Sequence, residues 1–227
     1  MSTLALGLTG AFAACGQSAD PEPVRVPAVP GPVREVSAPG ATSHHIWRLD
    51  AIKHGFPDGF TVGSHPAKRL DQHDIDNSGL QAFSAARVHP AQCRALLLPA
   101  HASPAVGTLA TALHAKGARG AMYVIAMRLP QPAPATDPPA GCQQMWVSGA
   151  PEVTGRASPI PAPRIAGVAT TGARLQVTEN SDPDYVFTAA LDERTCVVVV
   201  GAAAAELDPQ RLLAELLISA VTAIRRR

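Results

Sequence analysis

The densest group of polar side chains lies between residues 65 and 79, HPAKRLDQHDIDNSG. Histidine and aspartate bind metal ions in proteins, so this segment has to be considered as a metal site. The spacing of Asp74, Asp76 and Ser78 copies the opening of a calcium-binding EF-hand loop. That loop needs a bidentate glutamate at its twelfth position, where this chain has Ala85. We therefore predict a solvated loop that holds no metal.

The rest of the sequence has no residue spacing that is typical of a catalytic or cofactor site. His44 and His45 are adjacent and the other histidines are scattered, whereas zinc needs histidine or cysteine at fixed, close spacing. No H-E-x-x-H, C-x-x-C or G-x-S-x-G pattern occurs, and no glycine-rich phosphate loop. We predict no enzymatic activity and no cofactor. Because a Ser–His–Asp triad can assemble from any chain order, a hydrolase stays as an alternative.

Three cysteines follow Cys15 along the chain, so one thiol is left over after any pairing. Cys93 lies in an apolar turn and Cys142 in a loop rich in proline and glycine, and both places can be reached from the surface. Cys196 lies in the apolar run TCVVVV, which predicts a buried strand where cysteine acts as a small hydrophobe. We predict a disulfide between Cys93 and Cys142 and a reduced Cys196. A nucleophilic role for Cys196 is not expected, because apolar burial raises the pKa of a thiol.

The N-terminal segment has the pattern of an export signal. Residues 4–14, LALGLTGAFAA, form an apolar run that ends in small residues directly before Cys15, as in bacterial lipoprotein signals. The run is shorter than the ~20 apolar residues that span a bilayer, and residues 1–3 lack the usual positive charge. We predict that residues 1–15 are a lipoprotein signal and that Cys15 is lipidated. An ordinary secretion signal and a buried N-terminal helix are the alternatives.

The remaining chain divides into a tether and one domain. Residues 16–43 are rich in proline, alanine, serine and glycine, which predicts a flexible tether; a disordered terminus is the alternative. Residues 44–227 are long enough for a single domain with a substantial core. The formal net charge of +1 over 227 residues argues against nucleic-acid binding, which needs a basic face.

Hydrophobic periodicity predicts an α+β domain. The expected strands are a short one around Phe60 to Val62 and longer ones at 80–88, 106–115, 120–129, 168–178, 185–191 and 196–200. Helical segments are expected at 46–52 and 90–98, whereas 145–149 is either a helix end or a strand and 151–163 is broken by prolines. From Pro209 onward, leucines recur at helical spacing. We predict a mostly antiparallel sheet, packed by this C-terminal helix, with a shorter helix near Cys93.

Three short segments resemble a known family: AIKHGFPDGFTV at 51–62, PAQC at 90–93 and PAGCQ at 139–143. They look like mycobacterial lipoproteins of uncharacterised function, which place a lipid anchor and a proline-rich tether before one α+β domain. Those proteins are similar to the extracellular sensor domains of mycobacterial Ser/Thr receptor kinases, which carry disulfides and a ligand-sized cleft. The resemblance covers about residues 46–227 and implies fold and location rather than activity. The reduced Cys196 departs from the paired cysteines of the kinase domains.

These observations predict a non-enzymatic lipoprotein of the cell envelope, held on the extracytoplasmic face of the membrane, with a ligand-binding or sensor-like domain. Its ligand is expected to be a lipid or another amphipathic small molecule, held against the sheet face that the terminal helix leaves open. The alternatives are an envelope hydrolase and an adaptor that docks a partner through its proline-rich loop, residues 130–139. A large apolar cavity favours ligand binding, a His–Ser or His–Asp cluster in a cleft favours hydrolysis, and a flat apolar patch favours docking.

Overall fold

The computed structural model describes residues 44–78, 86–133, 135, 139–149, 153–177 and 182–225. The predicted signal with Cys15 and the predicted tether, residues 16–43, lie outside the described residues. None of the helices in the described ranges is long and apolar enough to cross a membrane.

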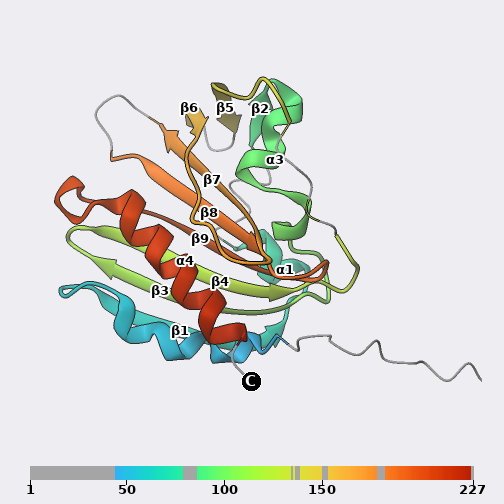
Figure 1. The fold of residues 1–227 in the computed structure, drawn as a ribbon, viewed down its shortest axis with the longest axis vertical. Coiled ribbons are helices and arrows are strands. Elements are labelled where there is room, and N and C mark those ends of the chain that lie inside the picture. Colours follow the sequence, from blue (N-terminus) through green and yellow to red (C-terminus); the bar gives the residue numbers. More distant parts are fainter. Residues whose placement is uncertain are drawn as a thin grey trace, which may run out of the picture. The chain divides into compact units, whose positions relative to one another are not determined.

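One sheet of nine strands forms the centre of the domain, in the order β1-β3-β4-β9-β8-β7-β6-β5-β2 (Figure 1). All neighbouring strands are antiparallel, as predicted. The strands are β1 (Thr61–Arg69), β2 (Arg87–His89), β3 (Leu109–Gly117), β4 (Gly120–Arg128), β5 (Met145–Gly149), β6 (Val153–Pro159), β7 (Ala169–Gln176), β8 (Asp184–Ala190) and β9 (Thr195–Ala203). The helices are η1 (Ile46–Gly55), α1 (Gln72–Asp76), η2 (Ala91–Cys93), α3 (Arg94–Leu97), η3 (Ala100–Ala102), η4 (Ala205–Leu207) and α4 (Pro209–Arg225).

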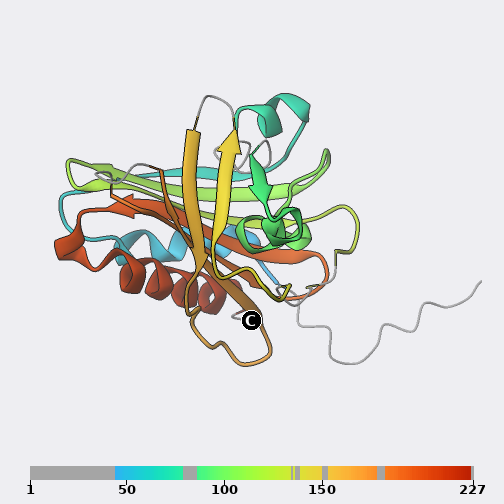
Figure 2. The same ribbon diagram turned by 90° about the horizontal axis from the view of Figure 1, so that it is seen from above.

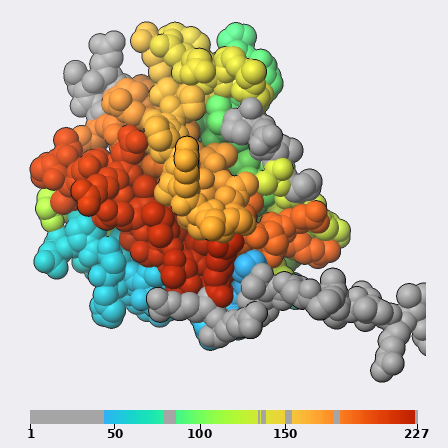
Figure 3. Space-filling view, viewed as in Figure 1, coloured from blue at the N-terminus to red at the C-terminus, as the bar shows by residue number. Residues whose placement is uncertain are grey.

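Helix α4 packs with η1 on one face of the sheet, over β4, β8 and β9. Its leucines recur every three or four residues, so they form one apolar stripe, and Leu213, Leu216 and Leu217 are buried with Ile224 against the sheet, as predicted. At its C-terminal end the Arg225 guanidinium donates hydrogen bonds to the carbonyl oxygens of Ala166 (2.9 Å) and Gly167 (3.2 Å). The segment between β6 and β7 therefore lies beside α4 (Figure 3).

On the opposite face of the sheet, η2 and α3 cover the end that contains β2, β5, β6 and β7. The Cys93–Cys142 disulfide, with 5.5 Å between the Cα atoms, joins this helical segment to the loop before β5, and the predicted pairing is confirmed. Both cysteines lie in a second apolar cluster with Leu96, Met145 and other residues of β2, β5, β6 and β7. Two separate apolar clusters thus hold the two ends of the sheet, on opposite faces.

The central strand β9 is buried on both faces. Val197 and Val199 face α4, whereas Cys196 and Val198 belong to an apolar cluster on the opposite side. A strand covered on both faces has apolar residues at every position rather than at alternate ones. Cys196 is reduced, as predicted, and its burial raises the pKa of its thiol to about 12.

The prediction of a solvated loop at residues 65–79 was wrong in part. Strand β1 continues to Arg69 because its backbone pairs with β3 on the sheet edge, and Gln72–Asp76 form helix α1. The helix begins with a capping box: the Asp71 side chain accepts from the Asp74 backbone N–H (2.8 Å), and the Asp74 side chain accepts from that of Asp71 (3.3 Å). Strand β6 was also missed, because its prolines lie at and beyond its end. Of the strand predicted at 80–88, residues 80–85 lie outside the described residues, and its last two residues, Arg87 and Val88, belong to β2.

Candidate functional site

The sheet face opposite α4 carries a pocket of about 410 Å³, here called the open-face pocket. Its floor is formed by β3 and β4 and one wall by α1 with the residues that flank it. Figure 2 shows α4 and η1 on one side of the sheet and α1 on the other. The volume falls in the range of small-molecule sites, about 300–1,000 Å³. The pocket lies on the face where the sequence predicts a ligand.

Strand register explains the shape and polarity of the floor. His65 of β1, Ala112 of β3 and Ile125 of β4 lie side by side in one cross-strand row. The next row places Lys68 beside Ala110 and Met127, and all six residues line the pocket. In each row a small alanine separates a polar residue on the sheet edge from a large apolar one, so the floor is hollow in the middle and changes from polar to apolar across the strands.

The wall is fixed to the sheet by hydrogen bonds at its base. The Leu70 backbone N–H donates to the Thr108 carbonyl (2.8 Å), and the Gly107 N–H donates to the Leu70 carbonyl (2.9 Å). The Lys68 ammonium forms an ion pair with the Asp74 carboxylate, which lowers the pKa of Asp74 through the hydrogen bond between them. Because Lys68 belongs to β1 and Asp74 to α1, this pair connects the floor to the wall.

His65, which lines the pocket, lies beside a second histidine, His114 of β3. The ring centroids of His65 and His114 are 5.1 Å apart, and a side chain at Gly63 would collide with the His114 ring, so glycine leaves room for the imidazole. Burial lowers the pKa of His114, and the neighbouring charges of His65 and Lys116 lower it further. The neutral form of the His114 imidazole is therefore favoured.

Comparison with known proteins identifies the domain. A family model described as a domain of unknown function, DUF5642, matches residues 45–225. The chain belongs to the DUF5642 family. The DUF5642 domain is also similar to an X-ray structure of an uncharacterised protein, the Rv0999 ortholog from Mycobacterium smegmatis, with a TM-score of 0.61 and 22% identity over 81% of this chain and 98% of that chain. That likeness shows the fold, and no curated protein matches.

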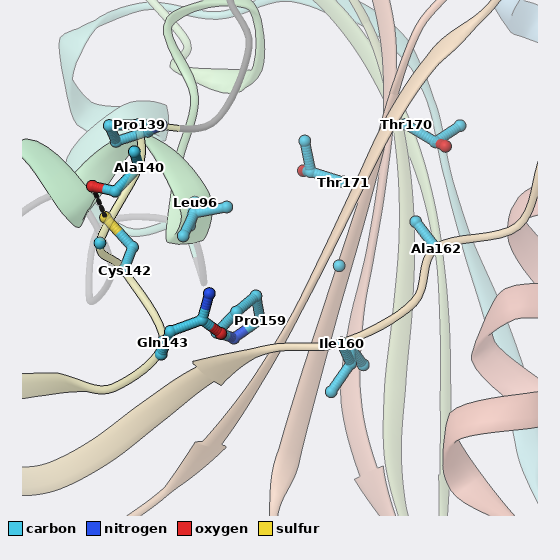
Figure 4. A pocket seen from close by; sticks show the side chains of 12 residues that line it. Leu96, Pro139, Ala140, Cys142, Gln143, Pro159, Ile160, Ala162, Thr170 and Thr171 are labelled. Carbon is cyan, nitrogen blue, oxygen red and sulfur yellow. Dashed lines mark hydrogen bonds between the residues drawn. The ribbon is translucent and has the colours of Figure 1, made fainter.

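The DUF5642 domain has a second, smaller pocket of about 290 Å³ beside the disulfide (Figure 4). Thr171 lines it, and its hydroxyl is 2.7 Å from that of Thr188, which lies 3.5 Å from Nε2 of His101. Burial lowers the pKa of His101, and within the described residues its Nδ1 has no hydrogen-bond partner. The hydrolase alternative requires a triad, in which a carboxylate at that nitrogen orients the imidazole. Among the described residues the Thr171–Thr188–His101 chain has no such carboxylate.

Several of the polar residues that were considered as metal ligands come together at the open-face pocket without forming a metal site among the described residues. His73 and Asp74 line the open-face pocket, but the described residues contain no group of three or more His, Cys, Asp or Glu side chains that could hold a metal ion. The floor residues Ala112, Ile125 and Met127 were missed individually. The run at 120–129 is apolar at almost every position, which indicates burial on both faces and hides the fact that part of one face lines a pocket.

Proposed function

We propose that this DUF5642 domain binds an amphipathic small molecule, such as a lipid, in the open-face pocket. The observation that carries the proposal is the change of polarity across the floor, from Lys68 and His65 on the sheet edge to Met127 and Ile125 on β4. The apolar part of a ligand would lie on β4, where burying it is favourable at about 25 cal/mol per Å². Its polar group would lie at the β1 edge, where histidine and lysine nitrogens can hydrogen-bond with it.

The proposed role is binding rather than catalysis. The Lys68 ammonium and the Asp74 carboxylate that face the pocket are paired with each other, an arrangement that favours the charged form of both and leaves further ammonium protons of Lys68 for the polar group of a ligand. A general base would need a pKa near the working pH and a free position for the proton that it accepts. We therefore propose a non-enzymatic, sensor-like domain, in keeping with the resemblance to the sensor domains of mycobacterial receptor kinases.

We further propose that the domain works outside the cytoplasm, tethered through a lipid on Cys15. The support is the lipoprotein-like segment before Cys15 and the disulfide between Cys93 and Cys142, because disulfides persist in oxidising, exported environments. A membrane-tethered domain with a pocket for an amphipathic molecule would have a local supply of such ligands.

The test is titration of the full chain with 11-(dansylamino)undecanoic acid, a fluorescent fatty acid. Ala112 lies in the middle of the floor, so Ala112→Phe fills the hollow, and we expect at least a tenfold loss of affinity. The matched control is Ala118→Phe, the same change at an exposed position in the β3–β4 turn, which should bind like the parent. Equal binding by all three proteins would contradict the proposal.

A further inference from the structure

Strands β2, β5, β6 and β7 carry an exposed polar surface, here called the arginine face, on the side of the sheet that faces α4. Cross-strand pairing places His89, Trp146, Arg156 and Gln176 in one row across the four strands. The face is the same as that of Tyr185, which pairs with Arg174 and packs toward α4. In the space-filling view the yellow and orange segments, which contain β5, β6 and β7, extend beyond the cover of α4 (Figure 3).

The strands of the arginine face carry arginines and no acidic residue of their own; the acidic side chains of Asp182 and Asp208 border Arg174 along one pocket wall, on the side of β8. The four strands contain Arg87, Arg156 and Arg174 and no aspartate or glutamate. All three arginines are exposed, and within the described ranges none of them is in an ion pair. The opposite side of the same strands is apolar and packs on α3 and the disulfide, so the cations are displayed on a rigid support.

A shallow notch of about 200 Å³ gives this surface a defined centre. Arg156 and Arg174 line it together with Gln144, Ser158 and Gln176. The Arg174 guanidinium donates a hydrogen bond to Oε1 of Gln176 (3.2 Å), which restrains its position. Two guanidinium groups, two amides and a hydroxyl thus border one small space.

An exposed tryptophan adjoins the notch. Trp146 keeps 52% of its surface exposed, although a large apolar side chain is favoured in the interior. The Arg156 guanidinium carbon lies 4.8 Å from the centroid of the Trp146 ring, a cation–π contact that holds both side chains on the surface. An aromatic platform and a paired set of guanidinium groups are therefore contiguous.

We propose that the arginine face binds an anionic glycan, a carbohydrate that carries carboxylate or phosphate groups. Arginine binds both anions through parallel hydrogen bonds. The negative face of the Trp146 indole can pack on the partly positive C–H groups of a sugar ring, and the amides of Gln144 and Gln176 can donate to and accept from sugar hydroxyl groups. Each group on the face thus has a counterpart in this class of ligand.

The composition of the face favours a glycan over a membrane surface or a nucleic acid. Binding to a bilayer surface grows with the apolar area that is buried in it. Among the described residues of these four strands, Trp146 is the one large apolar side chain that is exposed, so little apolar area is offered to a bilayer. Nucleic acids require the neutralisation of many phosphates along a long basic surface. Neutral hydrogen-bonding groups, including Ser148 and Thr154, alternate here with the cations, as recognition of hydroxyl groups requires.

The test uses the full chain with Trp47→Phe, so that Trp146 is the sole fluorescent reporter among the 2 tryptophans of the sequence. The probes are a galacturonic acid hexamer, a phosphorylated mannose oligosaccharide and, as the uncharged control, maltohexaose. We expect a saturable change of fluorescence with at least one anionic probe and none with maltohexaose. Arg156→Gln and Arg174→Gln should each weaken binding at least tenfold, because a charge-assisted hydrogen bond is lost.

The matched control is Arg128→Gln, which removes an exposed strand arginine outside the face and should bind like the Trp47→Phe parent. Equal weakening by Arg128→Gln would show general charge attraction and overturn the proposal. A lack of response to both anionic probes would overturn the proposal as well. If the parent then binds phosphatidylglycerol vesicles and Arg156→Gln does not, the arginine face binds a membrane surface instead of a glycan. Ala112→Phe should leave glycan binding unchanged, so failure here and failure of the open-face pocket are distinguishable.

Discussion

Truncation of Leu217 tests whether α4 is an integral part of the domain. Leu217 has 0% of its surface exposed and lies in the largest apolar cluster, between the helix and the sheet. Leu217→Ala removes most of a side chain at a place that neighbouring groups fill on every side. Since packed interiors relax only partly around such a change, a cavity remains.

The expected cost follows from this burial. Buried leucine-to-alanine changes cost about 2–5 kcal/mol, and more where the site cannot collapse. The neighbours of Leu217 belong to a helix and to strands that are paired on both sides, so we expect about 3–4 kcal/mol. For a domain of this size each kcal/mol lowers the melting temperature by about 2–4 °C, so the predicted fall is about 6–16 °C.

The assay is thermal unfolding followed by circular dichroism, with urea unfolding to give the free energy. Ile218→Ala is the matched control, because Ile218 is the next residue on the same helix and is 42% exposed. Its change should stay within about 1 kcal/mol. If Leu217→Ala melts like the parent, or no lower than Ile218→Ala, α4 is peripheral and the account of the core is wrong.

Three further predictions concern the anchor, the disulfide and the interior. Cys15→Ala should move the protein from the membrane fraction to the soluble fraction, because only the thiol can accept the lipid; unchanged fractionation would contradict the anchor. Replacing Cys93 and Cys142 together by serine should cost about 4 kcal/mol in urea unfolding, since the bridge closes a loop with a sequence separation of 49 residues; an unchanged midpoint would show that it contributes nothing. Burial lowers the pKa of His101, so below about pH 6.5 the unfolded chain binds a proton that the folded protein does not, and stability should fall from pH 7.5 to pH 5. His101→Gln should reduce that fall in urea unfolding at the two pH values, and an equal fall in both proteins would contradict this cause.

The elements that were predicted well are those whose apolar side chains follow a regular pattern because they pack against the core. Helix α4 has a stripe of leucines, and β3, β4, β8 and β9 have alternating or continuous apolar residues. Both patterns arise from contact with a core and can be seen in the sequence. The pairing of Cys93 with Cys142 followed because Cys196 stands in an unbroken apolar strand. Such patterns are local, so they can be interpreted without knowledge of the fold.

The missed elements depend on partners that are distant in the sequence. The second half of β1 exposes almost all its side chains, so its strand conformation comes from backbone pairing with β3 and leaves no apolar alternation. The open-face pocket arises in the same way. Its sheet face was anticipated, but the small residues that hollow it, Ala110 and Ala112, acquire that role only through their register with β1 and β4.

The most direct test of the open-face pocket is native mass spectrometry of the full chain, purified from the membranes of an expressing actinobacterial host. The parent and Ala118→Phe should each carry an added mass that collisional activation releases as a lipid or another amphipathic molecule. Ala112→Phe, whose new ring would lie between His65 and Ile125 on the floor, should lack it. An adduct retained in full by Ala112→Phe, or a parent without any adduct, would contradict the account.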